Sequence, residues 1–287
     1  MVVWRKNCIV IHNHQRLAMH FRLPLLIAIF SLGSSRLTAQ EMPTQRVARE
    51  PVLWGNYNME YYLPSGSFFF GEVSLRRSLQ SGLPTALGLN RAHIMVGYEQ
   101  RLTDHWHLGA SGRVVTEGNL AQLYNRAYLN HSGSIGRIEF LKQISVEQIN
   151  NLKAQTGSEG RFGVLVALAK NIPLANGRTF RPVFSYELFS LFAISNRFFF
   201  NDNKRRIDKT RLKLEGAYWF TERFSLALFM IHETDYFFAV AQFDQNGQQL
   251  NPDRRLNLLS PTVGVRAHFW LKHQDLPPSR RLRSLPY

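Results

Sequence analysis

The chain has 287 residues, 45% of them hydrophobic, and a formal net charge of +15 at pH 7. Its only cysteine is Cys8, which lies in the leader described below, so the chain without that leader has no disulfide and no thiol chemistry. A basic chain can bind nucleic acid, but these cations are spread along predicted strands together with Glu, and a secreted chain meets little nucleic acid. We therefore exclude nucleic acid as a partner, since anionic lipopolysaccharide at a cell surface accounts better for the charge.

Residues 1–39 have the features of a cleavable signal peptide. Basic residues, with no Asp or Glu, accompany an apolar core at Leu23–Gly33, and small residues follow that core. The core is too short to cross a bilayer as a helix. We expect cleavage after Ala39, and the start of translation is either Met1 or Met19. The rest of the chain has no stretch apolar enough for a membrane helix and no cysteine for a lipid anchor.

Apolar and polar residues alternate along most of the remaining chain. Leu212 and Leu214, for example, alternate with Lys213 and Glu215. Successive side chains of a strand point to opposite faces, so this alternation predicts strands with one apolar and one polar face. The predicted strands are Val52–Tyr62, Ser67–Arg77, Arg91–Arg101, His105–Glu117, Gln122–Asn130, Ile135–Gln148, Arg161–Lys170, Thr179–Phe192, Arg211–Phe220, Phe224–Phe238 and Arg255–Leu271.

These strands predict an all-β fold, an antiparallel transmembrane β-barrel of about ten to twelve strands over residues 51–272. Residues 40–50 would form an N-terminal periplasmic segment, and residues 273–287 a polar C-terminal tail. The candidate strands number eleven, whereas single-chain bacterial barrels usually have an even number. Counting Gln122–Asn130 as a loop gives ten strands, and one undetected strand gives twelve, which we prefer.

Loop lengths and charge fit the same fold. Short turns near residues 64, 103, 175 and 221 alternate with longer links near 82, 155, 200 and 247, as in barrels with short periplasmic turns and longer external loops. Arg and Glu recur together on one strand face, and the other face is nearly free of charge. We therefore expect the apolar face to point outward into lipid. A soluble β protein with the apolar face inside is the alternative.

Aromatic residues gather toward the ends of the predicted strands. In membrane barrels such residues form belts at the two membrane interfaces. The candidates for these belts are Trp54, Tyr61, Tyr62, Trp106, Phe198–Phe200, Trp219, Phe220, Tyr236–Phe238, Phe269 and Trp270.

Several motifs are shared with known barrels: Leu53-Trp54, Val96-Gly97-Tyr98 leading to Arg101-Leu102-Thr103, Tyr186-Glu187-Leu188-Phe189, and Arg211-Leu212-Lys213-Leu214 leading through Trp219-Phe220-Thr221-Glu222 to Phe224-Ser225-Leu226. On these motifs the chain from about Val52 to Leu271 resembles a family of Gram-negative outer-membrane barrels described only as a domain of unknown function. The resemblance implies a barrel in the outer membrane and brings no catalytic residues. Such barrels often end on an aromatic residue, whereas here a polar tail follows Phe269-Trp270.

The inward-facing charges are the predicted functional feature. A barrel of this size is much narrower than a porin, so we expect Arg–Glu pairs to fill it. A selective narrow pore is the alternative. The predicted lumen charge network consists of Glu72, Arg91, Glu99, Arg113, Arg137, Glu139, Arg181, Glu187, Arg211, Lys213, Glu215 and Arg266, and Glu60, Arg76, Glu117 and Arg161 are expected to face the same way.

Two histidine-containing motifs could carry chemistry, and we expect neither to do so. His131-Ser132-Gly133-Ser134 lacks the His-x-Ser spacing of outer-membrane phospholipases and is typical of a turn. His105 and His107 share a face, with Asp104 beside them and His93 on the preceding strand, but a metal site needs at least three converging ligands. We predict no catalytic residue, no metal site and no cofactor.

The sequence thus predicts an outer-membrane β-barrel that is structural or a narrow passage for small solutes, and not an enzyme. The alternatives are a phospholipase-like enzyme that modifies outer-membrane lipid, and a soluble periplasmic β protein. The expected partners are outer-membrane lipid, lipopolysaccharide and the outer-membrane assembly machinery. The sequence identifies no solute and no oligomeric state.

Overall fold

The computed structural model describes residues 44–79, 89, 91–153, 158–175, 177–194 and 206–272. The expected signal peptide and the expected C-terminal tail lie outside these residues. Within them, no helix is long and apolar enough to cross a membrane.

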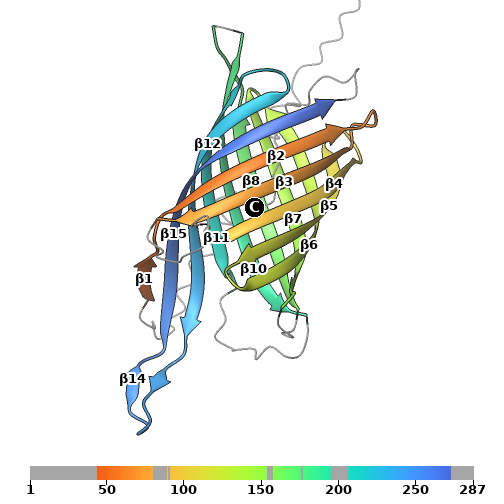
Figure 1. Cartoon of the computed structure of the whole chain (residues 1–287). Coiled ribbons are helices and arrows are strands. Elements are labelled where there is room, and N and C mark those ends of the chain that lie inside the picture. The colour runs from red at the N-terminus through yellow and green to blue at the C-terminus, as the bar shows by residue number, and fades with distance from the viewer. Residues whose placement is uncertain are drawn as a thin grey trace, which may run out of the picture. The chain divides into compact units, whose positions relative to one another are not determined.

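Eleven strands of the described chain form one closed, mostly antiparallel barrel (Figure 1). They are β2 (Val52–Tyr62), β3 (Phe68–Ser78), β4 (Arg91–Arg101), β5 (Trp106–Glu117), β6 (Leu120–Ile135), β7 (Ile138–Asn151), β8 (Glu159–Lys170), β10 (Thr179–Ala193), β11 (Lys209–Trp219), β12 (Phe224–Ala239) and β15 (Arg254–Lys272). Four short strands accompany them: β1 (Thr44–Ala48), β9 (Ile172–Pro173), β13 (Gln242–Phe243) and β14 (Gln249–Asn251). The all-β barrel is confirmed, and each predicted segment overlaps mainly with one barrel strand.

The barrel closes through a parallel pair, β2 and β15, in register from Val52 opposite Thr262 to Tyr62 opposite Lys272. With an odd number of up-and-down strands, the first and last run in the same direction, so their pairing must be parallel. The expectation of an even strand number, and with it the preference for twelve, is therefore wrong. β1 continues the same parallel pairing, from Thr44 opposite Arg255 to Ala48 opposite Leu259.

The connections between strands divide the barrel into two ends. We call the end with connections 63–67, 102–105, 136–137, 171–178 and 220–223 the short-turn end, and the opposite end, with connections 79–90, 118–119, 152–158, 194–208 and 240–253, the long-loop end. The hairpin of β13 and β14 belongs to the long-loop end. Because β2 begins at the long-loop end and β15 finishes at the short-turn end, β1 lies at the long-loop end.

Two sequence predictions in the middle of the chain are wrong. The segment 135–148 is not one strand, and His131–Ser134 is not a turn, because β6 continues through these residues to Ile135. The chain turns at Gly136-Arg137 instead, where Gly136 has a φ of 60°. Glycine adopts that left-handed conformation at little cost, which explains why the turn falls there. Gly118, with a φ of 56°, makes an unpredicted short turn at the long-loop end.

The polar face of the strands points into the barrel and the apolar face points out. In β4, His93 and Glu99 are 3% and 4% exposed, whereas Ile94 and Val96 are 61% and 64% exposed. Burial alternates in this way along most barrel strands. The outer surface of the barrel is therefore mostly apolar, and most charged side chains of the strands lie inside.

Candidate functional site: the barrel lumen

Charged side chains line the interior of the barrel. Eleven of the twelve residues predicted to form a lumen charge network occupy inward-facing positions: Glu72, Arg91, Glu99, Arg113, Glu139, Arg181, Glu187, Arg211, Lys213, Glu215 and Arg266. Arg137 does not, because it is the second residue of the turn between β6 and β7 and is exposed. Its prediction is wrong because the predicted strand 135–148 ran through that turn. Glu60, Arg76, Glu117 and Arg161 also face the lumen.

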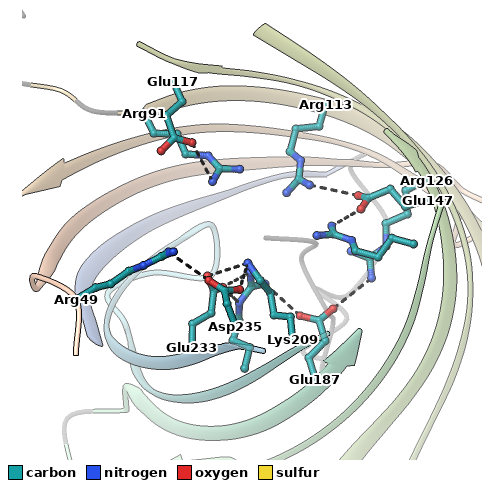
Figure 2. Close-up of polar contacts among 12 residues, drawn as sticks. Arg49, Arg91, Arg113, Glu117, Arg126, Glu147, Glu187, Lys209, Glu233 and Asp235 are labelled. Carbon is teal, nitrogen blue, oxygen red and sulfur yellow. Dashed lines mark hydrogen bonds and ion pairs between the residues drawn. The ribbon is translucent and has the colours of Figure 1, made fainter. Parts of the chain in front are cut away.

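A continuous chain of ion pairs crosses the lumen, and Figure 2 shows most of its members. In order of contact it consists of Arg126, Glu187, Arg211, Glu233, Lys209, Asp235 and Arg49, and we call it the cross-lumen network. Arg126 Nη2 on β6 lies 3.5 Å from Glu187 Oε1 on β10, although β7 and β8 separate these strands along the barrel wall. The contact therefore bridges non-adjacent parts of the wall.

The rest of the cross-lumen network joins β10, β11, β12 and the segment before β2. Arg211 donates hydrogen bonds to Glu233 at 2.6 and 3.0 Å and to Glu187 at 3.2 Å. Lys209 Nζ lies 2.8 Å from an oxygen of Asp235 and 3.0 Å from one of Glu233. Arg49 then donates to Asp235 at 3.3 Å, which connects the N-terminal segment to β12.

A second cluster is centred on Glu147 of β7. Arg113 Nη2 on β5 lies 3.2 Å from Glu147 Oε1, and Arg161 on β8 pairs with the other oxygen. The side chains of Glu147, Arg113 and Arg161 are 4%, 6% and 13% exposed. Removing one partner of a buried pair typically costs about 3–5 kcal/mol, because a desolvated charge is left uncompensated. Glu147 of β7 therefore stabilises the contacts of its strand with side chains of β5 and β8.

Further pairs line the rest of the lumen, several of them toward the short-turn end. His93 Nε2 lies 2.6 Å from Glu72 Oε1, and Glu215 pairs with both Lys213 and Arg266. Arg181 of β10 pairs with Glu139 of β7 across β8. Glu99 accepts hydrogen bonds from Asn130 at 3.0 Å and Tyr128 at 3.1 Å. Polar groups buried in this part of the lumen are thus mostly bonded to one another.

An apolar cluster occupies the lumen from its middle to the short-turn end. Its buried members are Tyr62, Phe68, Phe70, Met95, Tyr128, Trp219 and Trp270. They come from β2, β3, β4, β6, β11 and β15, so the cluster connects opposite sides of the wall. Trp219 and Trp270 stack with their ring centres 4.2 Å apart. Trp54, Tyr62, Trp219 and Trp270 therefore point inward, and their assignment to outer aromatic belts is wrong.

Two cavities lie at the long-loop end of the lumen. The larger, of about 640 Å³, is lined by Trp54, Arg76, Arg91 and Glu233 among others. The smaller, of about 440 Å³, is bounded by aromatic side chains and by Lys209, Asp235 and Arg49 of the cross-lumen network. Arg49 lines both cavities. The lumen therefore combines open space at one end with a packed apolar cluster toward the other.

Six charged residues of these clusters were not predicted from the sequence: Arg49, Arg126, Glu147, Lys209, Glu233 and Asp235. For Glu147 the signal was present, because it follows Gln143 and Ser145 at the two-residue spacing of an inward face. Arg49 could not be found in this way, since it precedes the first barrel strand.

The structure separates the residues of both histidine motifs. The ring of His131 lies between Trp106 and Phe140, at 4.6 and 5.6 Å between ring centres, on the outward side of β6. Ser132 faces inward and is 8% exposed. Because the two side chains point to opposite faces, His131 cannot act as a base for Ser132.

The other histidines are far apart along their strands. His107 pairs with Arg101 at the short-turn end, whereas His93 pairs with Val115 near the long-loop end of the same two strands. Within the described residues, no group of three or more His, Cys, Asp or Glu side chains is placed to hold a metal ion.

No family model matches the chain, and no curated protein matches it. The resemblance to outer-membrane barrels therefore stays a prediction from the sequence motifs. The geometry of the lumen and of the outer surface carries the functional argument.

Proposed function

We propose that the protein is an outer-membrane β-barrel with an occluded lumen. The observation that carries the proposal is the polarity of the wall: Leu228 and Val96 are each 64% exposed, whereas Glu60 and Glu72 are 1% and 2% exposed. Exposing this many large apolar side chains to water is unfavourable by about 25 cal/mol per Å². Lipid around the barrel removes that cost, and the inward charges find their partners in the lumen.

Outward aromatic side chains at the short-turn end support a membrane interface there. Phe69 packs on Tyr98 at 5.0 Å between ring centres, and Phe224 packs on Phe269 at 4.6 Å. Trp106 is 43% exposed. The amphipathic rings of Tyr and Trp favour the headgroup region, and girdles of aromatic residues mark the interfaces of membrane barrels.

The proposed lumen is a support for the wall and not an open channel for general diffusion. The cross-lumen network connects β6 with β10, and the apolar cluster fills the lumen toward the short-turn end. Solutes would have to displace both. We propose no catalytic activity, because His131 and Ser132 lie on opposite faces of β6.

The proposed orientation has the short-turn end in the periplasm and the long-loop end outside, following the loop lengths of bacterial barrels. β1 lies at the long-loop end, so this orientation places residues 44–48 outside the cell. It is therefore incompatible with the predicted periplasmic location of this N-terminal segment. We favour the orientation given by the loops.

Single-cysteine labelling tests the membrane location, because residues 40–287 contain no cysteine. Leu214→Cys, at a position 52% exposed on the outer wall, should not react with a membrane-impermeant maleimide in intact outer membranes but should react in detergent. Asn246→Cys, in the hairpin of β13 and β14, is the matched control and should react in both. If Leu214→Cys were recovered in the soluble fraction and reacted as rapidly as Asn246→Cys, the protein would instead be a water-soluble barrel.

A further inference from the structure

Arg76 is an inward-facing cation without an acidic partner. Within the described chain, no carboxylate oxygen lies within 4.0 Å of its guanidinium nitrogens, and its Nε is buried without a hydrogen-bond partner. The contrast is with Arg91, Arg113, Arg126, Arg161, Arg181, Lys209, Arg211, Lys213 and Arg266, each of which pairs with a carboxylate. The guanidinium carbon of Arg76 lies 3.4 Å from the ring centre of Trp54, and this stacking fixes its plane.

A second arginine stands directly beside Arg76. Arg91 is its cross-strand partner in the pairing of β3 with β4, and both side chains line the 640 Å³ cavity. Like charges at directly opposed positions of a sheet destabilise the pair. A third cation, Arg49, lines the same cavity. Arg76 and Arg91 thus place two positive charges side by side at this cavity, whose lining also includes Glu50, Glu117 and Glu233.

The carboxylates that line this cavity are bound by other residues or only weakly paired with its cations. Glu233 binds Arg211 and Lys209, and Glu50 accepts a hydrogen bond from Ser78 at 2.6 Å. Glu117 lies 3.5 Å from Arg91, but its side chain is 56% exposed, so this ion pair is screened by solvent. Glu233 attracts Arg76 from a distance, and none of these acids forms a direct ion pair with it.

We propose that the larger cavity at the long-loop end binds a small soluble oxyanion, which carries a phosphate or a carboxylate group, between Arg76 and Arg91. A guanidinium group donates two parallel hydrogen bonds to such oxygens, and these charge-assisted bonds are stronger than neutral ones. The cavity also presents Ser260 and Thr262 among its lining residues. Because the apolar cluster lies at the other end of the lumen, the cavity would hold an anion and would not serve as a passage through the barrel.

Calorimetric titration of the refolded chain in a non-ionic detergent tests the proposal. Sodium phosphate and disodium succinate are the two probes, and sodium chloride at matched ionic strength is the control. We expect saturable heat with at least one oxyanion and none with chloride; the probe that binds more tightly identifies phosphate or carboxylate as the preferred group. Absence of saturable heat with both oxyanions overturns the proposal.

Variants assign the binding to the cavity. Arg76→Gln should weaken the tighter probe at least about tenfold, since a hydrogen bond to a charged group contributes about 1.5–3 kcal/mol. Arg77→Gln is the matched control, because the adjacent side chain is exposed and points outward, and it should bind like the unmodified chain. Equal binding by Arg76→Gln and the unmodified chain overturns the proposal.

Folding gives an independent readout. Removing one of two opposed cations should leave the barrel at least as resistant to thermal unfolding as the unmodified chain. A variant Arg76→Gln that does not refold would contradict the proposal, because it would show that Arg76 serves the fold and not a ligand. Arg91→Gln should also weaken binding, so that two positions identify the same site.

Discussion

Neutralising Glu147 should destabilise the barrel strongly, because this carboxylate compensates two buried cations. Arg113 and Arg161 both pair with Glu147, and the side chains of Glu147 and Arg113 are 4% and 6% exposed. Glu147→Gln keeps the size of the side chain and removes its charge. Breaking one buried pair costs about 3–5 kcal/mol, and we expect a loss of this size in the free energy of unfolding.

The matched control is Glu117→Gln, which makes the same chemical change at an exposed pair. Glu117 lies 3.5 Å from Arg91 and is 56% exposed, so its loss should cost at most about 1 kcal/mol. The measurement is urea unfolding of the refolded barrel in lipid vesicles, followed by tryptophan fluorescence and repeated for refolding to establish equilibrium. Equal destabilisation by the two variants, or a loss below about 1 kcal/mol for Glu147→Gln, would refute the view that buried ion pairs support the wall.

Three further predictions follow from the lumen and the seam of the barrel. In planar bilayers the unmodified protein should carry little steady current, and the double change of Arg211 and Arg181 to Ala should raise it; large stable conductance without mutation would contradict the occluded lumen. Gly264→Ala should destabilise by about 1–3 kcal/mol in the same urea assay, because its Cβ would lie 2.4 Å from the backbone oxygen of Trp54, whereas Gly55→Ala, with no atom within 4 Å, should be neutral. Phospholipid vesicles should release no fatty acid with or without calcium; release that is abolished by His131→Ala would reveal an active site where we propose none.

The strand pattern was predictable because one physical rule governs it over long stretches. In β11, Leu214 is exposed and Lys213 and Glu215 are buried, as the two-residue alternation requires. The positions of the tight turns were harder to predict from the sequence. Gly136 and Gly118 make tight turns with positive φ. A single glycine in an alternating sequence does not indicate on which side of it the strand ends. Arg137 was assigned to the lumen for that reason.

The partners inside the lumen could not be predicted from the sequence. Arg126 and Glu187 meet only because the wall curves round and brings β6 toward β10, and that distance depends on strand tilt and stagger. The prediction of an even number of strands was also wrong, because nothing in the sequences of β2 and β15 distinguishes a parallel closing pair from an antiparallel one. Alternation places Trp54 and Trp219 inside the barrel, yet their position near strand ends favoured an aromatic belt. Clustering at strand ends is therefore a weaker guide than alternation.

The most direct test of the central claim is a nitroxide scan along β4 in lipid vesicles. Spin labels at positions 94 and 96 replace Ile94 and Val96, which are 61% and 64% exposed, and a label at position 95 replaces Met95, which is 1% exposed. Collisions with oxygen report lipid, and collisions with a water-soluble nickel complex report solvent. We predict that labels at 94 and 96 collide with oxygen and not with nickel, while the label at 95 is shielded from both. Free access of nickel to positions 94 and 96 would contradict it, because the apolar face would then be in water.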